Sequence, residues 1–226
     1  MSPSVSPRRL IRSFVRREGR ITPAQRRALA ELWPRYGLDA GETPLDFARI
    51  FGRRAPVVLE IGFGDGEALA ATAAAHPEND YVGVEVYRPG VGALLRRLAA
   101  QNLANVRVVA ADAKDVMATR VPDGSLAAVH LFFPDPWPKK RHHKRRLVQP
   151  DFAALVAVKL APGGYFHAAT DWSDYAAHMA AVLAQAPGMV EDVTRAVLLA
   201  RPLTRFERRG RRLGHAMHDL VYRRSA

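Results

Sequence analysis

Asp135 is the acidic residue whose surroundings in the sequence most clearly suit chemistry. It follows the apolar stretch 127–133 and stands between Pro134 and Pro136, which restrict the backbone around its carboxylate. Six lysine or arginine residues then fall within the eight positions 139–146. A fixed carboxylate beside a dense cationic run is typical of a site that presents one acid to a polyanionic substrate. A proline-rich turn followed by a solvated charged loop would give the same pattern, so these residues alone do not distinguish a functional site from a surface loop.

A second pattern is the glycine run that follows the apolar segment Val57–Ile61. Gly62, Gly64 and Gly66 allow a tight turn and a close approach of the backbone to a ligand, just before a predicted helix. In dinucleotide-binding folds the third glycine comes one residue later, which argues against a nicotinamide-dependent oxidoreductase. S-adenosylmethionine has no pyrophosphate and carries a cationic ammonium and sulfonium, so the acid Glu60 before the glycines suits it. The run therefore predicts an S-adenosylmethionine site.

Acidic residues also end the next two predicted strands, at Glu85 and Asp112. Glu85 comes about 20 residues after the glycines, where an acid can accept hydrogen bonds from ribose hydroxyls. Asp112 could stand beside an adenine ring. Each acid alone is more often a helix cap or a turn residue. Three acids at successive strand ends, with Glu60 as the first, share the sheet edge at which such folds bind ligands, and they strengthen the prediction.

The motif around Asp135 leaves two kinds of methyl acceptor open. Methylation of an exocyclic amine often uses an acid or amide, two prolines and an aromatic residue, to which Pro134–Trp137 is similar. Guanine N7 instead has an in-plane lone pair and no proton, so direct displacement at the methyl group needs no general base. For that acceptor, Asp135 would orient the guanine through its N1 and N2 donors or stabilise the positive charge that develops on the ring. Trp137 either stacks on a base or anchors the loop.

The order of predicted elements indicates an α/β fold with a mostly parallel, twisted sheet and helices on both faces. Strands are predicted at Val57–Ile61, Tyr81–Val86, Val106–Ala110, Leu126–Phe133 and Gly164–Ala169. Helices are predicted at Glu67–Ala75, Pro89–Gln101, Ala113–Ala118, Pro150–Leu160 and Ser173–Ala186. The stretches 190–200 and 215–222 are predicted as two further strands around a loop rich in arginine and glycine.

Three segments are predicted along the chain. Residues 1–36 form a basic N-terminal arm that ends in a short helix at 23–36, opened by Thr22 and Pro23. Residues 37–55 form a linker with many turn signals, and 56–226 form the methyltransferase domain.

The composition points to a nucleic-acid partner. The chain has 226 residues and a net charge of +12, with 34 basic against 22 acidic residues. The basic residues cluster in 1–27, 139–146 and 201–226 and leave a slightly acidic body, as expected of an RNA-binding protein. Cysteine is absent, which excludes disulfides and a cysteine nucleophile and is compatible with a cytoplasmic location. No apolar run approaches the roughly 20 residues that span a bilayer, so no membrane partner is expected.

Six motifs together resemble those of bacterial tRNA (guanine-N7)-methyltransferases of the TrmB type. The resemblance extends from about residue 11 to 224, and its motifs are Ile11–Arg17, Glu60–Gly64, Pro89–Gly92, Phe132–Arg146, Ala169–Trp172 and Thr204–Glu207. It implies a Rossmann-like class I S-adenosylmethionine-dependent methyltransferase that modifies N7 of the guanine in the tRNA variable loop (tRNA position 46). S-adenosylhomocysteine would be the product.

The resemblance also implies roles for individual residues. S-adenosylmethionine would be bound by Glu60, Gly62, Gly64, Gly66, Glu85, Asp112, Ala113 and Asp135, of which Asp135 is also catalytic. The substrate nucleotide would be held by Lys139, Asp171, Thr204, Arg205, Phe206 and Glu207. RNA would be contacted by Arg141, His142, His143, Lys144, Arg145 and Arg146. The N-terminal arm would contact RNA or cover the site.

Several alternatives stay open on the sequence. Asp171 could instead cap the helix predicted from Ser173, and Glu207 could simply pair with neighbouring arginines. The histidine pairs 142–143 and 215/218 lack converging acids, so no metal is expected. An amino methyltransferase acting on adenine or another exocyclic amine is the main rival, and a noncatalytic RNA-binding protein is another. The sequence is compatible with a monomer or a homodimer.

Overall fold

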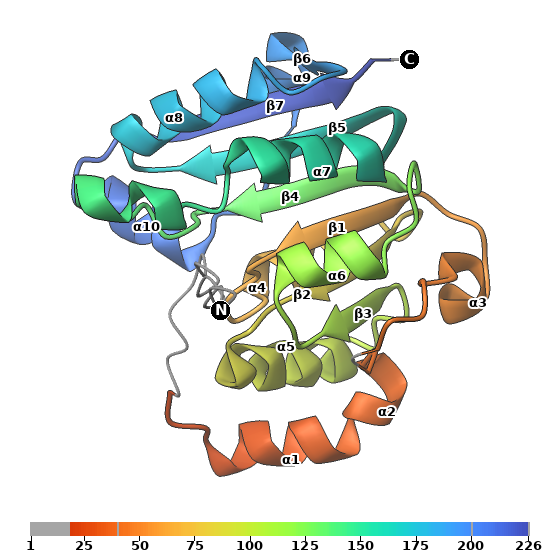
Figure 1. Ribbon diagram of the computed structural model, residues 1–226. Helices are drawn as coiled ribbons and strands as arrows, with labels where there is room; N and C mark the ends of the chain where they lie inside the picture. The colour runs from red at the N-terminus through yellow and green to blue at the C-terminus, as the bar shows by residue number, and fades with distance from the viewer. Residues whose placement is uncertain (1–18, 40, 200, 226) are drawn as a thin grey trace, which may run out of the picture.

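One seven-stranded sheet forms the centre of the molecule (Figure 1). The computed structural model describes residues 19–39, 41–199 and 201–225, so the arm predicted before residue 19 lies outside the described residues. The strands are β1 (Val57–Ile61), β2 (Asp80–Val84), β3 (Val106–Val109), β4 (Leu126–Phe132), β5 (Leu160–Thr170), β6 (Met189–Glu191) and β7 (His218–Arg224). Their spatial order is β3-β2-β1-β4-β5-β7-β6. All pairs from β3 across to β5 are parallel, whereas β7 is antiparallel to both of its neighbours, so the predicted mostly parallel sheet is confirmed.

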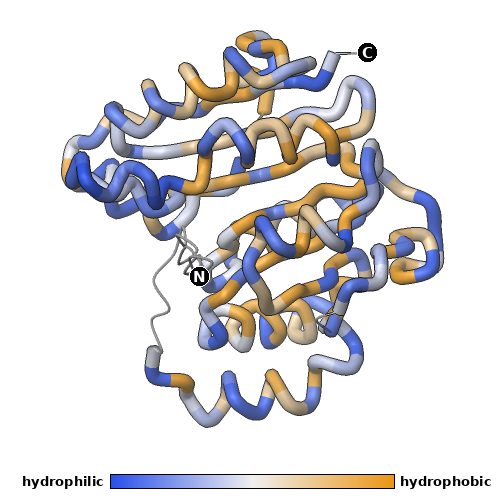
Figure 2. The backbone as a smooth tube through the Cα atoms, viewed as in Figure 1, coloured by the Kyte–Doolittle hydropathy of each residue, from blue (hydrophilic) through white to orange (hydrophobic). Residues whose placement is uncertain are grey.

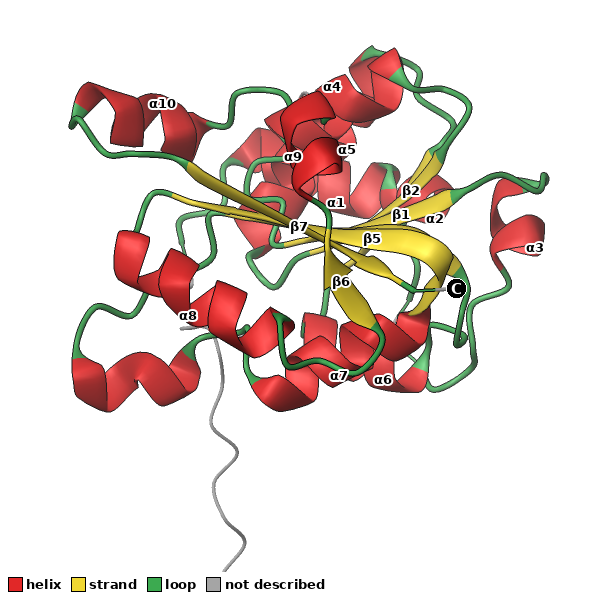
Figure 3. Cartoon of the chain, turned by 90° about the horizontal axis from the view of Figure 1, so that it is seen from above, coloured by secondary structure: helices red, strands yellow, loops and turns green. Residues whose placement is uncertain are grey.

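Helices connect the parallel strands and cover both faces of the sheet. The connecting helices are α4 (Glu67–Ala75), α5 (Arg88–Ala100), α6 (Ala113–Thr119), α7 (Pro150–Lys159) and α8 (Ser173–Leu183). Figure 3 shows α6, α7 and α8 on one face and α4 and α5 on the other. Each face has its own apolar core, and every residue of β1 is buried because β1 lies between the two. The strand order reverses between β1 and β4, which is where folds of this kind open a crevice for ligands.

The segment before the sheet packs onto it through α1 (Pro23–Glu31) and α2 (Trp33–Tyr36). Thr22 caps α1, because its hydroxyl accepts a hydrogen bond from the Gln25 amide at 3.2 Å while the Gln25 side chain accepts from the Thr22 amide at 2.9 Å. α1 packs against α5, where Gly92 leaves room for the backbone of Gln25. The stretch predicted as a linker contains α3 (Phe47–Phe51).

The C-terminal region differs from the prediction in two places. The stretch 190–200, predicted as one strand, contains the end of β6 and then α9 (Val193–Leu198), which Asp192 caps through the Arg195 amide at 2.9 Å. The segment predicted as an arginine- and glycine-rich loop is α10 (Arg205–Arg212). Thr204 caps it by accepting a hydrogen bond from the Glu207 amide at 3.1 Å. In both places a capping side chain starts a helix where the valine or glycine content favoured another structure.

Hydropathy follows these layers. In Figure 2 the strands and the inner helix faces are largely hydrophobic, whereas α10 and the 3-10 helix η1 (Lys140–Arg145) form strongly hydrophilic stretches near the ends of β4 and β5. Within the described ranges, no helix is both long enough and apolar enough to cross a membrane.

Candidate active site

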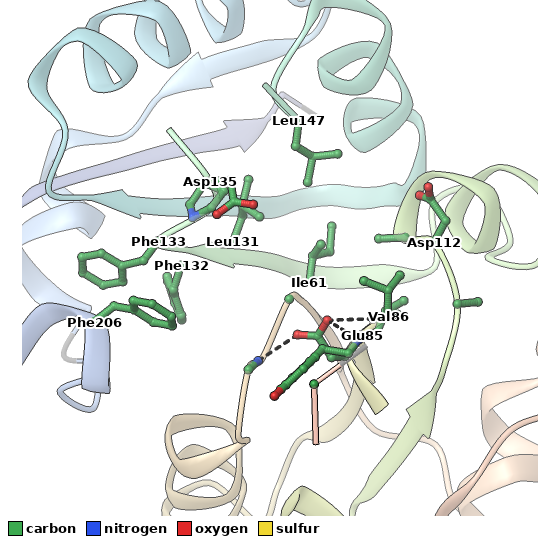
Figure 4. Close-up of a pocket in the computed structure, with 18 residues that line it drawn as sticks. Ile61, Glu85, Val86, Asp112, Leu131, Phe132, Phe133, Asp135, Leu147 and Phe206 are labelled. Atoms are coloured by element: carbon green, nitrogen blue, oxygen red, sulfur yellow. Dashed lines mark hydrogen bonds between the residues drawn. The ribbon is translucent and has the colours of Figure 1, made fainter. Parts of the chain in front are cut away.

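A cavity of about 450 Å³ opens where β1, β2, β3 and β4 end (Figure 4). Its lining includes the following predicted site residues: Gly62, Gly64, Glu85, Asp112, Ala113, Asp135 and Phe206. The remaining wall is mostly apolar and comes mainly from the ends of the same strands, with Gly19 from the segment before α1 and Leu147 from the segment that follows η1. The strand ends therefore bring one group of the predicted residues together. Other predicted residues do not line the cavity: Glu60, Gly66, Lys139, Asp171, Thr204, Arg205 and Glu207.

The glycine turn forms the floor of this cavity. Gly62 and Gly64 have φ angles of 70° and 62°, which side chains disfavour, and a Cβ built on either would meet nothing within 4 Å. The space beside them is therefore open to a ligand. Gly90 of α5 explains how the turn is supported: a Cβ there would lie 2.0 Å from the carbonyl oxygen of Gly64. Close packing of α5 against the turn thus depends on glycine at position 90.

Glu85 forms the opposite wall from Asp135, as Figure 4 shows. Its Oε2 accepts a hydrogen bond from the Gly64 amide at 3.0 Å, and its Oε1 accepts from Val86 at 2.7 Å and Tyr87 at 2.9 Å. Burial raises the pKa of Glu85, although these backbone hydrogen bonds favour its charged form. The carboxylate thus fixes the glycine turn relative to β2 while its side chain reaches the cavity.

Glu60 lies one residue before the cavity wall and is almost fully buried. Burial raises its pKa to about 8, so the carboxyl group is largely protonated at neutral pH. It pairs in register with His130 of β4, whose pKa is lowered to about 3 by burial and then by nearby His167. The two neighbouring side chains are therefore both neutral near pH 7, and a cationic ligand would favour ionisation of Glu60.

Asp112 combines two roles. Its Oδ1 accepts a hydrogen bond from the Lys114 amide at 2.9 Å and caps α6, which was the alternative expected for a strand-end acid. Asp112 also lines the cavity together with Ala113, on the side away from Phe206 in Figure 4. The cap holds the carboxylate at the cavity wall, so the two roles are compatible.

Asp135 sits on a loop with an unusual backbone. The residues before and after its proline frame, Phe133 and Trp137, have φ angles of 52° and 47°. Bulky side chains rarely adopt such angles, and strain of this kind clusters at functional sites. The Phe133 amide donates to the Ala169 carbonyl oxygen at 2.7 Å, which ties the loop to β5. This bent loop places Asp135 at the cavity, exposed to solvent on one side.

The cationic run contains both exposed and anchoring residues. Arg141 and Lys144 are exposed, as is Lys139 before the helix. His142 lies edge-on to the Trp137 ring, with a centroid separation of 5.9 Å, and the Arg145 guanidinium lies 5.0 Å from the same ring. The structure thus supports the role of Trp137 as a loop anchor.

The prediction that Arg146 contacts RNA is wrong. Arg146 is 2% exposed, ion-paired with Asp174 and hydrogen-bonded through Nε to the Pro136 carbonyl oxygen at 3.0 Å. Its guanidinium also lies over the Tyr175 ring, 4.9 Å from the centroid. Arg146 therefore fastens the Asp135 loop to α8 and has no surface to offer to RNA.

Helix α10 approaches the cavity from the face of the sheet that α4 covers. Phe206 lines the cavity beside Phe132 and Phe133 (Figure 4). Arg208 forms an ion pair with Glu67 of α4 at 2.8 Å, so α10 is connected to the helix that follows the glycine turn. In contrast, Glu207 points inward and is 2% exposed.

Arg201 holds this helix in place and was not anticipated. It forms an ion pair with Glu207 and donates to Asp219 of β7 at 2.7 Å from Nε and 3.0 Å from Nη2. Its guanidinium also lies over the rings of Phe132 and Phe133, 5.5 and 5.2 Å from their centroids. Arg201 thereby connects α10, β7 and the loop that bears Asp135. An isolated arginine gives no sequence signal for such a role.

Asp171 lies beneath α10. Its Oδ2 is 3.0 Å from Nδ1 of His215, and a Cβ on Gly210 would come within 2.8 Å of the same oxygen. α8 has no side-chain cap, so the alternative role of Asp171 as its cap is not supported. Among the described ranges, histidine and acidic side chains form no cluster that could hold a metal ion.

Comparisons with known proteins place the chain in a family. Residues 54–220 match the family model described as "Putative methyltransferase". The tRNA (guanine-N(7)-)-methyltransferase of Alkalilimnicola ehrlichii is 59% identical over 223 residues, covering 96% of this chain and 94% of that protein. The protein of the same name from Nitrosococcus oceani is 55% identical over 217 residues, covering 96% and 92%.

Solved structures agree on the fold. The 16S rRNA methyltransferase KamB superposes with a TM-score of 0.58 at 19% identity, over 81% of this chain and 95% of that chain. A 16S rRNA (adenine(1408)-N(1))-methyltransferase from Catenulisporales acidiphilia, solved with S-adenosylmethionine, gives 0.53 at 17% identity, over 79% and 90%. At this identity they show the fold alone, which confirms the predicted Rossmann-like class I architecture. By its sequence relatives, the chain belongs to the bacterial tRNA (guanine-N(7)-)-methyltransferase family.

Proposed function

We propose that this protein transfers a methyl group from S-adenosylmethionine to N7 of the guanine at position 46 in the tRNA variable loop. Family membership supports the reaction, and the relatives act on tRNA according to their names. The observation that most strongly supports the assignment is that one cavity is lined by the glycine turn, by Asp135 and by Phe206 of the segment predicted to hold the nucleotide.

The residues present fit S-adenosylmethionine. Gly62 and Gly64 leave open space that side chains at these positions would occupy. Glu85 and Asp112 stand at the ends of β2 and β3, on the same rim of the cavity. Glu60 is a buried, protonated acid whose ionised form would offset a ligand cation. When bound, the ligand supplies an electrophilic methyl group on a sulfonium.

Asp135 acts on the acceptor base. N7 attacks with a lone pair and loses no proton, so the carboxylate is not a general base. It orients the guanine through N–H donors on the opposite edge of the ring and offsets the positive charge that methylation leaves on the base. Phe132, Phe133 and Phe206 supply an apolar wall beside it, which suits a flat ring that has left its stack.

The test is transfer of a labelled methyl group to tRNA transcripts that contain or lack the variable-loop guanine. Incorporation only into the guanine-containing transcript, followed by strand cleavage specific for 7-methylguanine, is the expected result. Incorporation without that cleavage would instead identify an amino methyltransferase. Binding of tRNA by a folded sample with no incorporation would leave only a noncatalytic RNA-binding protein.

A further inference from the structure

The five arginines of α10 fall into two groups. Arg208 pairs with Glu67 at 2.8 Å and Arg211 pairs with Glu207 at 2.6 Å, so two of the five guanidinium groups are engaged with carboxylates. Within the part of the chain that the structure describes, the other three side chains are exposed and form no ion pair or hydrogen bond: Arg205, Arg209 and Arg212.

These three arginines lie on one stripe of the helix. Their spacing of i, i+4 and i+7 places them on the same face, with about 5–6 Å between neighbouring Cβ atoms. The opposite face contains Glu207 and Gly210, which are both buried and which pack against Arg201 and Asp171. α10 is therefore fixed by its inner face, and its outer face presents an unpaired row of positive charge.

The stripe and η1 flank the cavity from opposite faces of the sheet. η1 is connected to α8, because His143 and the adjacent Arg146 both approach Asp174. α10 is instead connected to α4 through Arg208. Figure 3 shows α8 and α10 on opposite faces of the sheet, and Asp135 lies in the loop that follows β4 and lines the cavity. An RNA whose base enters the cavity from this edge would meet cationic groups on both sides.

We propose that Arg209 and Arg212, continuing the row from Arg205, form a second RNA-docking surface that binds phosphates of the tRNA on the side opposite η1. The inference rests on the proposed function and adds residues beyond the Thr204–Glu207 segment. Arginine suits the role because its planar guanidinium can donate two parallel hydrogen bonds to one phosphate. Two-sided contact would hold the strands that flank an extruded base.

A basic helix with exposed apolar residues can also bind an anionic membrane surface, but the arrangement here favours RNA. Phe206 lines the cavity, so it is directed toward the site rather than away from the protein. That leaves Leu203, just before the helix, and Leu213, just after it, as the exposed large apolar side chains next to the stripe. Two leucines at the ends of an eight-residue helix bury too little apolar surface for stable membrane binding.

The test compares the double variant Arg209→Gln/Arg212→Gln with a control that removes the same charge elsewhere, Arg54→Gln/Arg96→Gln. Both control residues are exposed and form no ion pair among the described residues. The tRNA dissociation constant is measured from about 50 to 200 mM salt, together with kcat, KM for tRNA and affinity for S-adenosylmethionine. Loss of two phosphate contacts should lower the log–log salt slope by about 1.4–1.8.

The double variant should also raise KM for tRNA at least fivefold and leave kcat and S-adenosylmethionine affinity unchanged, while the control resembles the wild type. A double variant whose slope and KM match the control overturns the docking surface, even if the wild type methylates tRNA normally. Loss of binding to phosphatidylserine vesicles with unchanged tRNA affinity would assign the stripe to membranes and also overturn it. Failure of the wild type to methylate tRNA would count against the proposed function instead.

Discussion

Asp135 shows how one residue is prepared for its task by backbone restraint. Pro134 and Pro136 frame it, Phe133 and Trp137 adopt strained angles, and Arg146 fastens the loop from beneath. The sequence predicted that the two prolines restrict the backbone around Asp135 and that Asp135 lies at the end of a strand. It did not predict that the last residue of the cationic run would turn inward, because burial of one guanidinium depends on Asp174 and Tyr175, which are distant in sequence.

Replacing Asp135 by Asn preserves the shape of the side chain and removes its charge. We expect kcat to fall by about 10²–10³, as for other groups that stabilise developing charge, with tRNA affinity largely retained. Single-turnover methylation and filter binding measure the two effects separately. Asp115→Asn on the exposed part of α6 is the control, and near-normal turnover by Asp135→Asn would contradict the assignment.

Glu60 predicts a pH dependence of stability. Its pKa of about 8 in the folded protein lies above the ordinary glutamate value of 4.5, so from about pH 4.5 to 8 the folded state holds a proton that the unfolded chain releases. The free energy of unfolding should therefore decrease as pH rises through this window. Urea titrations of the wild type and Glu60→Gln should converge at low pH and diverge in favour of the variant toward pH 8. Parallel pH profiles would show that Glu60 is ionised when folded.

Arg201 is expected to act as a positioning residue for the tRNA site. Arg201→Gln removes one cation from the buried Glu207 and from the exposed Asp219, and losing one partner of a buried pair such as Arg201–Glu207 typically costs about 3–5 kcal/mol. We expect KM for tRNA to rise at least tenfold, with S-adenosylmethionine affinity unchanged and partial recovery in Arg201→Lys.

Arg53→Gln, which removes the partner of the buried Asp80 far from the cavity, is the matched control for lost stability. Assays well below both melting temperatures separate positioning from unfolding. If Arg53→Gln and Arg201→Gln raise KM equally, Arg201 has only a structural role.

At the scale of elements, α5 and the glycine turn depend on each other. Alanine normally stabilises a helix relative to glycine by about 1 kcal/mol, yet a Cβ at Gly90 would collide with the Gly64 carbonyl oxygen at 2.0 Å. Gly90→Ala should therefore destabilise the protein, by about 1–3 kcal/mol as for other overpacked sites, and weaken S-adenosylmethionine binding. Denaturation and calorimetry test this, with Gly41→Ala in open space as the control. A Gly90→Ala variant more stable than the wild type would contradict the close packing of α5 against the glycine turn.

The parallel part of the fold was largely predictable because strand and helix patterns alternate there. β1 and α4 match the prediction at both ends. β5 begins at Leu160, four residues before the predicted Gly164, because Leu160 pairs with Leu126 of β4. α9 and α10 were not predicted. Their starts depend on single capping side chains, and the Thr204-x-x-Glu207 pattern was the one available signal for α10.

For the molecule as a whole, charge is distributed around the cavity edge rather than evenly. The net charge of +12 includes two separate cationic elements, η1 and α10, on opposite faces of the sheet. Composition predicted the clusters, whereas their placement on either side of one cavity follows only from the sheet topology.

This separation predicts additive effects on tRNA binding. Arg141→Gln/Lys144→Gln in η1 and Arg209→Gln/Arg212→Gln in α10 share no partner, and distant independent sites add within about 0.5 kcal/mol. The quadruple variant should lose about 2.8–3.6 from the salt slope if each arginine or lysine contacts one phosphate. Electrophoretic mobility shifts across salt concentrations measure it. A quadruple variant no weaker than either double variant would mean that the two elements bind the same phosphates.

The insertion of β7 between β5 and β6 has a consequence for biosynthesis. Both of these earlier strands pair with residues 218–224, so neither can complete its hydrogen bonding on that side while those residues are still inside the ribosome. Asp219, on the same strand, is also needed to hold Arg201. A nascent chain released before codon 218 would therefore leave the long edge of β5 unpaired and open to pairing with strands of other polypeptides.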